Sequence, residues 1–90
     1  MHTLSRNTRK DKKWMVQGGG RTIHFGASGY DDFTTHKDPE RKTRYLARHR
    51  GEDWDNPDSA GFWARWLLWN KPSLAASVRD TEKRFGLQIR

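Results

Sequence analysis

The side chains that most often bind catalytic metals are present, but their spacing is unlike that of a metal site. Four histidines and eleven acidic residues are scattered along the 90 residues and form no ligand motif. Imidazole and carboxylate groups together can hold a divalent ion and activate water, so a nuclease is one interpretation. The residues that it would need are His36 and His49 with Asp31, Asp32 or Asp53. A packing role for His49 beside Tyr45, four residues earlier, is favoured, so we expect no metal, no cofactor and no catalytic residue.

Three consecutive glycines, Gly18, Gly19 and Gly20, have the composition of a loop that binds phosphate. Such loops lead directly into a helix and commonly end in lysine followed by serine or threonine. Here the strand-like run 21–25 comes next instead. The glycines therefore predict the tight turn of a β-hairpin, where positive φ angles are needed.

Charge is the strongest functional signal in the chain. Eighteen lysines and arginines oppose eleven acidic residues, which gives a formal net charge of +7 and a pI of about 10.3. A positive field of this size around so small a protein makes polyanions the expected partners, and nucleic acid is the first of these.

Arg41, Arg44 and Arg48 follow one another at i, i+3 and i+7, so they share one stripe of an expected helix. The stripe could be a solvated face that Asp38 and Glu40 partly neutralise, but we favour contact with phosphates, together with the N-terminal cations. No base-reading motif is visible, so such binding should be largely independent of sequence. The predicted nucleic-acid-binding residues are Arg6, Arg9, Lys10, Lys12, Lys13, Arg41, Arg44 and Arg48.

The N-terminus predicts a disordered arm followed by a hairpin. Residues 1–13 are polar and basic, with Leu4 as the only large apolar side chain after Met1, so they have little to bury. Residues 14–17 and 21–25 have strand composition and flank the three glycines. Because an isolated hairpin is marginal in water, its apolar face must pack on a later part of the chain.

Three helices are expected after the hairpin, over residues 38–50, around the apolar run 62–69, and over 73–85. Capping side chains stand at their starts, and a glycine follows the first and the third. The tail 87–90 alternates in polarity, so it could add a strand to the hairpin, although frayed termini are commoner.

Five tryptophans dominate a chain that is only 32% hydrophobic, which predicts a core built on indole rings. Trp63 and Trp66 lie on the widest apolar arc of the second helix, about 160° across, and are expected at the centre. Trp54 or Trp69 could instead be exposed and stack on an unpaired base. The predicted fold is a small α+β domain over residues 14–90, with an N-terminal β-hairpin packed against about three helices.

The absence of cysteine excludes disulfides, thiolate zinc sites and a cysteine nucleophile. The first residues lack the apolar stretch of a signal peptide, and no window approaches the roughly 20 apolar residues that span a bilayer. We therefore expect a soluble intracellular protein with no membrane partner.

A set of short motifs extends over much of the chain, namely IHFG at 23–26, YDDFTTHKD at 30–38, RK at 41–42, Tyr45, RH at 48–49, DW at 53–54, AGFW at 60–63 and LLWNKP at 67–72. On these motifs the chain, from about residue 13 to residue 85, resembles a family of small uncharacterised basic proteins encoded by large double-stranded DNA viruses of algae and amoebae, and found in viral metagenomes. The resemblance implies a viral origin and a place in the virion or on the viral genome.

These observations support three hypotheses in order. The first is a non-enzymatic nucleic-acid-binding protein that coats or condenses a viral genome, with double-stranded DNA as the expected partner. The second is a structural component of the virion, a minor capsid or assembly protein, whose basic arm contacts other virion proteins. The third is the metal-dependent nuclease. The expected location is the cytoplasm or nucleus of an infected host cell, or the virion itself.

Overall fold

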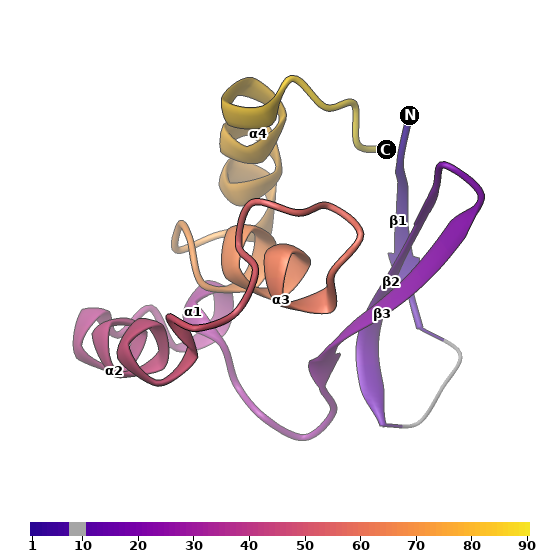
Figure 1. Cartoon of the computed structure of the whole chain (residues 1–90). Coiled ribbons are helices and arrows are strands. Elements are labelled where there is room, and N and C mark those ends of the chain that lie inside the picture. Colours follow the sequence, from indigo (N-terminus) through magenta and orange to yellow (C-terminus); the bar gives the residue numbers. More distant parts are fainter. Residues whose placement is uncertain (8–10) are drawn as a thin grey trace.

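The computed structural model describes residues 1–7 and 11–90, and it consists of a three-stranded antiparallel sheet followed by helices (Figure 1). The sheet and the helices pack on one another, so the predicted α+β class is confirmed. The elements in chain order are β1 (Thr3–Arg6), β2 (Lys12–Gly18), β3 (Arg21–Ala27), α1 (Phe33–His36), α2 (Pro39–His49), α3 (Ala60–Trp63), the π-helix η1 (Ala64–Leu68) and α4 (Leu74–Phe85).

The predicted hairpin is present as β2 and β3. Gly18 pairs with Arg21, and the two residues between them, Gly19 and Gly20, have φ angles of 59° and 77°. Positive φ at both central positions is the type I′ geometry, which matches the twist of the strands and favours glycine. The glycine run is therefore a turn and leads into a strand, which excludes the phosphate-loop interpretation.

The N-terminus differs from the disordered arm that composition predicts. Residues 3–6 form β1, which pairs with β2 so that Leu4 lies opposite Val16, and Lys12 and Lys13 belong to β2 itself. The backbone of β2 supplies the hydrogen bonds, so β1 needs only Leu4 to join the core. Arg9 and Lys10 lie outside the described residues.

The C-terminal tail does not fray. It lies beside β1, where Ile89 forms a parallel bridge with His2, and the two chain ends are adjacent (Figure 1). The His2 amide donates to the Gln88 carbonyl at 2.7 Å, and the Arg90 amide donates to the His2 carbonyl at 2.8 Å. The His2 ring also packs on Trp63, with 5.1 Å between centroids. The tail extends the sheet at β1 rather than at the hairpin.

The first and third predicted helices are confirmed as α2 and α4. Asp38 caps α2 by accepting a hydrogen bond from the Glu40 amide at 3.0 Å, and proline follows it. Ser73 caps α4 in the same way, and Gly86 ends it in the left-handed conformation. None of the described helices is long and apolar enough to cross a membrane.

The second predicted helix is not uniform. It begins as α3 and continues as the π-helix η1, in which the Trp69 amide donates to the Ala64 carbonyl five residues earlier. A π-helix has more residues per turn, so each side chain advances through a smaller angle than an α-helix predicts. Leu68 is therefore buried, and Trp66 is only partly buried. The prediction that places Trp66 at the centre of the core is wrong.

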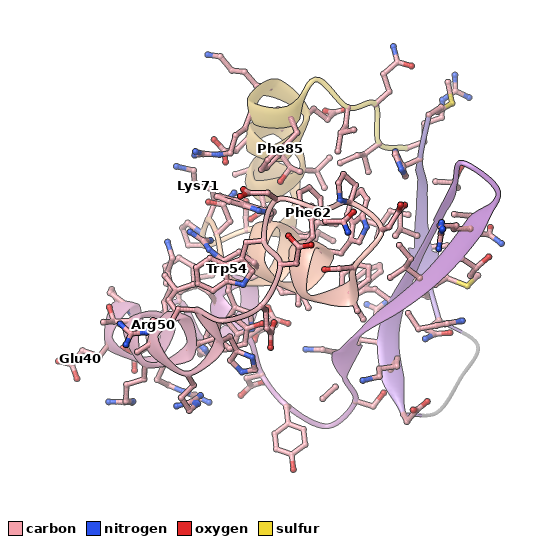
Figure 2. The ribbon with its side chains drawn as sticks, viewed as in Figure 1. Glu40, Arg50, Trp54, Phe62, Lys71 and Phe85 are labelled. Atoms are coloured by element: carbon pink, nitrogen blue, oxygen red, sulfur yellow. The ribbon has the colours of Figure 1, made fainter. Side chains whose placement is uncertain are left out.

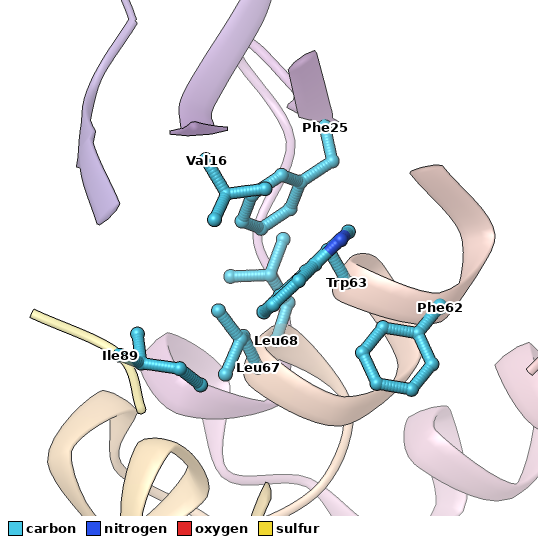
Figure 3. Packing of buried hydrophobic residues seen from close by; sticks show 7 residues of the cluster. All are labelled: Val16, Phe25, Phe62, Trp63, Leu67, Leu68 and Ile89. Carbon is cyan, nitrogen blue, oxygen red and sulfur yellow. The ribbon is translucent and has the colours of Figure 1, made fainter. Parts of the chain in front are cut away.

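The core lies between the sheet and the α3–η1 segment (Figure 3). Trp63 has no exposed surface, and its Nε1 donates to the Pro57 carbonyl at 2.7 Å, so the one polar group of this ring is satisfied. The expectation for Trp63 is confirmed. The buried cluster consists of Val16, Phe25, Phe62, Trp63, Leu67, Leu68 and Ile89.

Candidate nucleic-acid interface

A cleft of about 540 Å³ lies between the sheet and α2. Its walls come from the start of β2, the end of β3, the segment 27–32, one side of α2, and α3 with η1. The residues at its floor are buried, namely Phe25, Tyr45 and Leu68, whereas the cationic residues of α2 at its rim are exposed. The cleft therefore combines an apolar floor with a charged rim.

The arginine stripe forms one side of this rim. Arg41, Arg44 and Arg48 are exposed and line the cleft, and no hydrogen bond or ion pair joins their guanidinium groups to any described residue. Asp38 instead caps α2, and Glu40 points away from the sheet (Figure 2). The acids that could have neutralised the stripe do not pair with it, so its charge remains available to a ligand.

The two lysines of β2 have different roles, although both line the cleft. Lys13 donates to the Asp32 carboxylate at 2.6 Å and to the Tyr30 carbonyl at 2.7 Å, so its charge is already neutralised. Lys12 forms no ion pair with the described residues. Of the two, Lys12 is the one that can contribute to an electrostatic interface.

The remaining predicted contacts lie elsewhere. Arg6 is exposed on β1, outside the cleft, and its guanidinium lies 4.6 Å from the centre of the Trp14 ring. Five of the eight predicted residues are thus brought together, and Arg6 is separate. The five that line the cleft are Lys12, Lys13, Arg41, Arg44 and Arg48.

A column of aromatic rings holds α2 in place. Trp69 stacks on Tyr45 with 4.2 Å between centroids and an interplanar angle of 4°, and Tyr45 stacks on His49 at 4.1 Å. The predicted pairing of His49 with Tyr45 is confirmed, while the contact with Trp69 has no periodic signal in the sequence. Burial, assisted by the nearby Glu52 carboxylate, raises the pKa of Tyr45 to about 12. This column fixes the orientation of α2 and, with it, the arginine stripe.

Trp54 does not offer a free ring. The guanidinium of Arg65 lies 5.4 Å from the centre of the Trp54 ring and 4.2 Å from that of Trp66, and Arg84 lies 4.7 Å from Trp66. The backbone carbonyl of Trp54 accepts a hydrogen bond from the Trp66 Nε1 at 2.7 Å. These contacts assign Trp54 to the packing of the α3–η1 segment, away from the cleft.

The residues of the nuclease interpretation do not converge. Within residues 1–7 and 11–90, no three histidines or acids are grouped so that they could hold a metal ion. His36 packs on Trp69 and accepts a hydrogen bond from the Asp38 amide, whereas His49 packs on Tyr45 and contacts Glu52. The rings of Trp69 and Tyr45 therefore separate the two imidazoles.

Sequence patterns missed several residues of the cleft. Tyr30 lines the cleft and is 74% exposed. The only sequence feature that could have indicated its exposure is its place directly after a glycine-rich loop. Gly61 also lines it, and a Cβ atom there would lie 2.7 Å from the Glu52 carboxylate, so the glycine allows the Glu52 side chain to approach α3 this closely.

A family model matches residues 2–49, which is just over half of the chain; its description is "Family of unknown function (DUF5754)". The chain belongs to this family. The part that matches DUF5754 contains the sheet, α1 and α2, and therefore all the cationic residues of the cleft. A search of curated proteins and a search of solved structures each found no match.

Proposed function

We propose that this protein binds nucleic acid without catalysing a reaction, through contacts with backbone phosphates that are largely independent of sequence. The observation that carries the proposal is the arginine stripe. Arg41, Arg44 and Arg48 are exposed along one rim of a cleft, with Lys12 on another wall and no acidic partner among the described residues.

Guanidinium groups suit this role because each can donate two parallel hydrogen bonds to a phosphate. The three side chains follow one helix face, so they can engage successive phosphates along a strand. Each phosphate contact releases condensed counterions, which makes affinity fall as salt rises. Such contacts position a protein on nucleic acid but read no sequence.

Coating or condensation of a viral genome remains the biological setting that we propose, with double-stranded DNA as the expected partner. The rival proposal is a virion assembly protein that uses a disordered basic arm for protein contacts. Residues 3–6 are paired in the sheet, which removes much of the reason for proposing such an arm. The proposal of nucleic-acid binding therefore takes precedence.

The test is a salt-titrated measurement of fluorescence anisotropy with labelled duplex DNA of two unrelated sequences. We expect binding at about 50 mM salt, equal affinity for the two sequences, and a log–log slope of about −0.9 for each phosphate contacted. An absence of binding at about 50 mM salt would overturn the proposal and favour virion assembly.

A further inference from the structure

The opposite wall of the cleft presents an exposed aromatic ring. Tyr30 is 74% exposed, and Met1 is the only other large apolar side chain that the described residues leave exposed. The segment that carries Tyr30 is held in place, because Lys13 donates to the Tyr30 carbonyl at 2.7 Å and to the buried Asp32 carboxylate. A fixed backbone thus holds a ring that no other ring of the described chain covers.

A second aromatic surface lies on α2, where His49 ends the stack that begins with Trp69 and Tyr45. Its side chain is 35% exposed, and it lines the same cleft as Tyr30. One face of the imidazole rests on Tyr45, and its Nδ1 contacts the Glu52 carboxylate, so the plane of the ring is fixed. A flat ligand that stacked on the other face would extend the column.

We propose that the cleft holds an unpaired base of a single-stranded nucleic acid. The base contacts Tyr30 and His49, and Arg41, Arg44 and Arg48 bind the flanking phosphates. The charge of the lining favours this occupant, because five cations line the cleft against three acids, Asp31, Asp32 and Glu52. Asp32 pairs with Lys13 and Glu52 contacts His49, whereas the guanidinium groups of the stripe form no ion pair with the described residues. The volume of about 540 Å³ lies within the range of roughly 300–1,000 Å³ for small-ligand pockets, so a single nucleotide fits. This inference rests on the proposed function and changes one part of it, because a single strand replaces double-stranded DNA as the preferred form of nucleic acid.

Single strands should be preferred because only an unpaired base can turn its face toward a protein ring. The bases of a duplex are stacked on one another, and extruding one costs a few kcal/mol. A duplex therefore gains the phosphate contacts alone, whereas a single strand gains phosphate contacts and stacking. Stacking depends little on which base is present, which agrees with binding that is independent of sequence.

The experiment compares four labelled probes of equal length in the same buffer, namely oligo(dT), oligo(U), an abasic deoxyribose strand and a duplex. We expect the wild-type protein to bind oligo(dT) or oligo(U) about tenfold or more tightly than the abasic strand, which has the same phosphates and no bases. Oligo(dT) and oligo(U) differ both in the sugar and in the C5 methyl group of the base, so the proposal requires only that each binds more tightly than the abasic strand.

Tyr30→Ala should weaken binding of the preferred homopolymer about tenfold and leave binding of the abasic strand unchanged. His49→Ala should do the same, and His49→Phe, which keeps a flat ring on Tyr45, should restore the affinity. Ala60→Phe should fill the cleft, so it should also weaken binding of the homopolymer about tenfold and leave binding of the abasic strand unchanged. Ala75→Phe is its matched control, because Ala75 is also an exposed alanine in the first turn of a helix but lies outside the cleft.

Equal binding of homopolymer and abasic strand, with no effect of Tyr30→Ala, would overturn the inference and leave phosphate binding intact. Loss of binding to all four probes would instead overturn the proposed function itself. The two failures are thus distinguishable in one set of titrations.

Discussion

The ammonium of Lys13 lies 2.6 Å from the carboxylate of Asp32, which is only 3% exposed. Asp32 also accepts hydrogen bonds from the amide and the hydroxyl of Thr34, so it caps α1 while it holds Lys13. This contact joins β2 to the start of the helical half. It therefore fixes the segment 27–32, which forms one wall of the cleft.

Lys13→Ala should destabilise the protein by about 1–3 kcal/mol, because it leaves a buried carboxylate without its cation. Lys12→Ala is the matched control, since Lys12 is adjacent to Lys13 in β2 and forms no ion pair with the described residues. Urea denaturation monitored by tryptophan fluorescence measures the free energy of unfolding of both variants. Equal stability of the two variants would show that the contact with Asp32 contributes nothing.

Trp63→Ala should cost about 3–5 kcal/mol and largely unfold the domain, because its ring is fully buried between the sheet and α3. Trp66→Ala should cost less, about 0.5–3 kcal/mol, since Trp66 is only partly buried and packs under Arg65 and Arg84. Thermal unfolding monitored by circular dichroism gives the melting temperatures of the two variants, and that of Trp63→Ala should be the lower. The reverse order of their melting temperatures would contradict the assignment of the core.

Stability should fall in alkaline solution because of Tyr45. Burial raises its pKa from 10.0 to about 12, so the folded state holds the phenolic proton more tightly than the unfolded chain does. The contribution of Tyr45 to the unfolding free energy is therefore complete below pH 10 and is lost as the pH rises from 10 to about 12. Tyr45→Phe should remove this part of the pH dependence. Parallel stability profiles for wild type and Tyr45→Phe above pH 10 would show that Tyr45 does not titrate differently on folding.

We expect no hydrolysis of DNA or RNA in the presence of magnesium, manganese or zinc. Within residues 1–7 and 11–90 no cluster of histidines and acids is arranged as a metal site, and His36 and His49 pack on different rings. Gel assays with increasing protein measure any loss of substrate. Hydrolysis that disappears in His36→Ala or His49→Ala would refute this expectation, whereas a contaminating nuclease would survive both substitutions.

The elements with strong local signals could be predicted from the sequence. The glycines at 18–20 predicted the turn of the hairpin, Asp38 predicted the start of α2, and Gly86 predicted the end of α4. In each case the requirement is local, either a positive φ angle or a backbone amide that needs a cap. Few residue types meet such a requirement, so their presence in the sequence is informative.

Features that depend on contacts distant in sequence could not be predicted. β1 forms because the backbone of β2 pairs with it, although the composition of residues 1–13 favours disorder. The π-turn that displaces Trp66 leaves no pattern in the sequence. The arginine stripe follows from helical periodicity, whereas its place on a cleft with Tyr30 depends on how the β3–α1 segment folds back toward α2.

The central claim concerns the charge of the stripe, and it is tested most directly with two triple variants that lose the same net charge. In the first, Arg41, Arg44 and Arg48 are replaced by alanine. The second, the control, replaces three exposed cations outside the cleft, Lys71, Arg79 and Lys83.

Affinity for nucleic acid is measured for both variants and for wild type across a range of salt, after circular dichroism has verified that each is folded. We predict that the stripe variant loses up to roughly 2.7 from the log–log slope on duplex DNA, or about 2.1 on a single strand, together with most of its affinity at low salt. The control variant should keep a slope close to that of wild type. Equal slopes and affinities in the two variants would contradict the claim, because binding would then follow net charge alone and not the cleft.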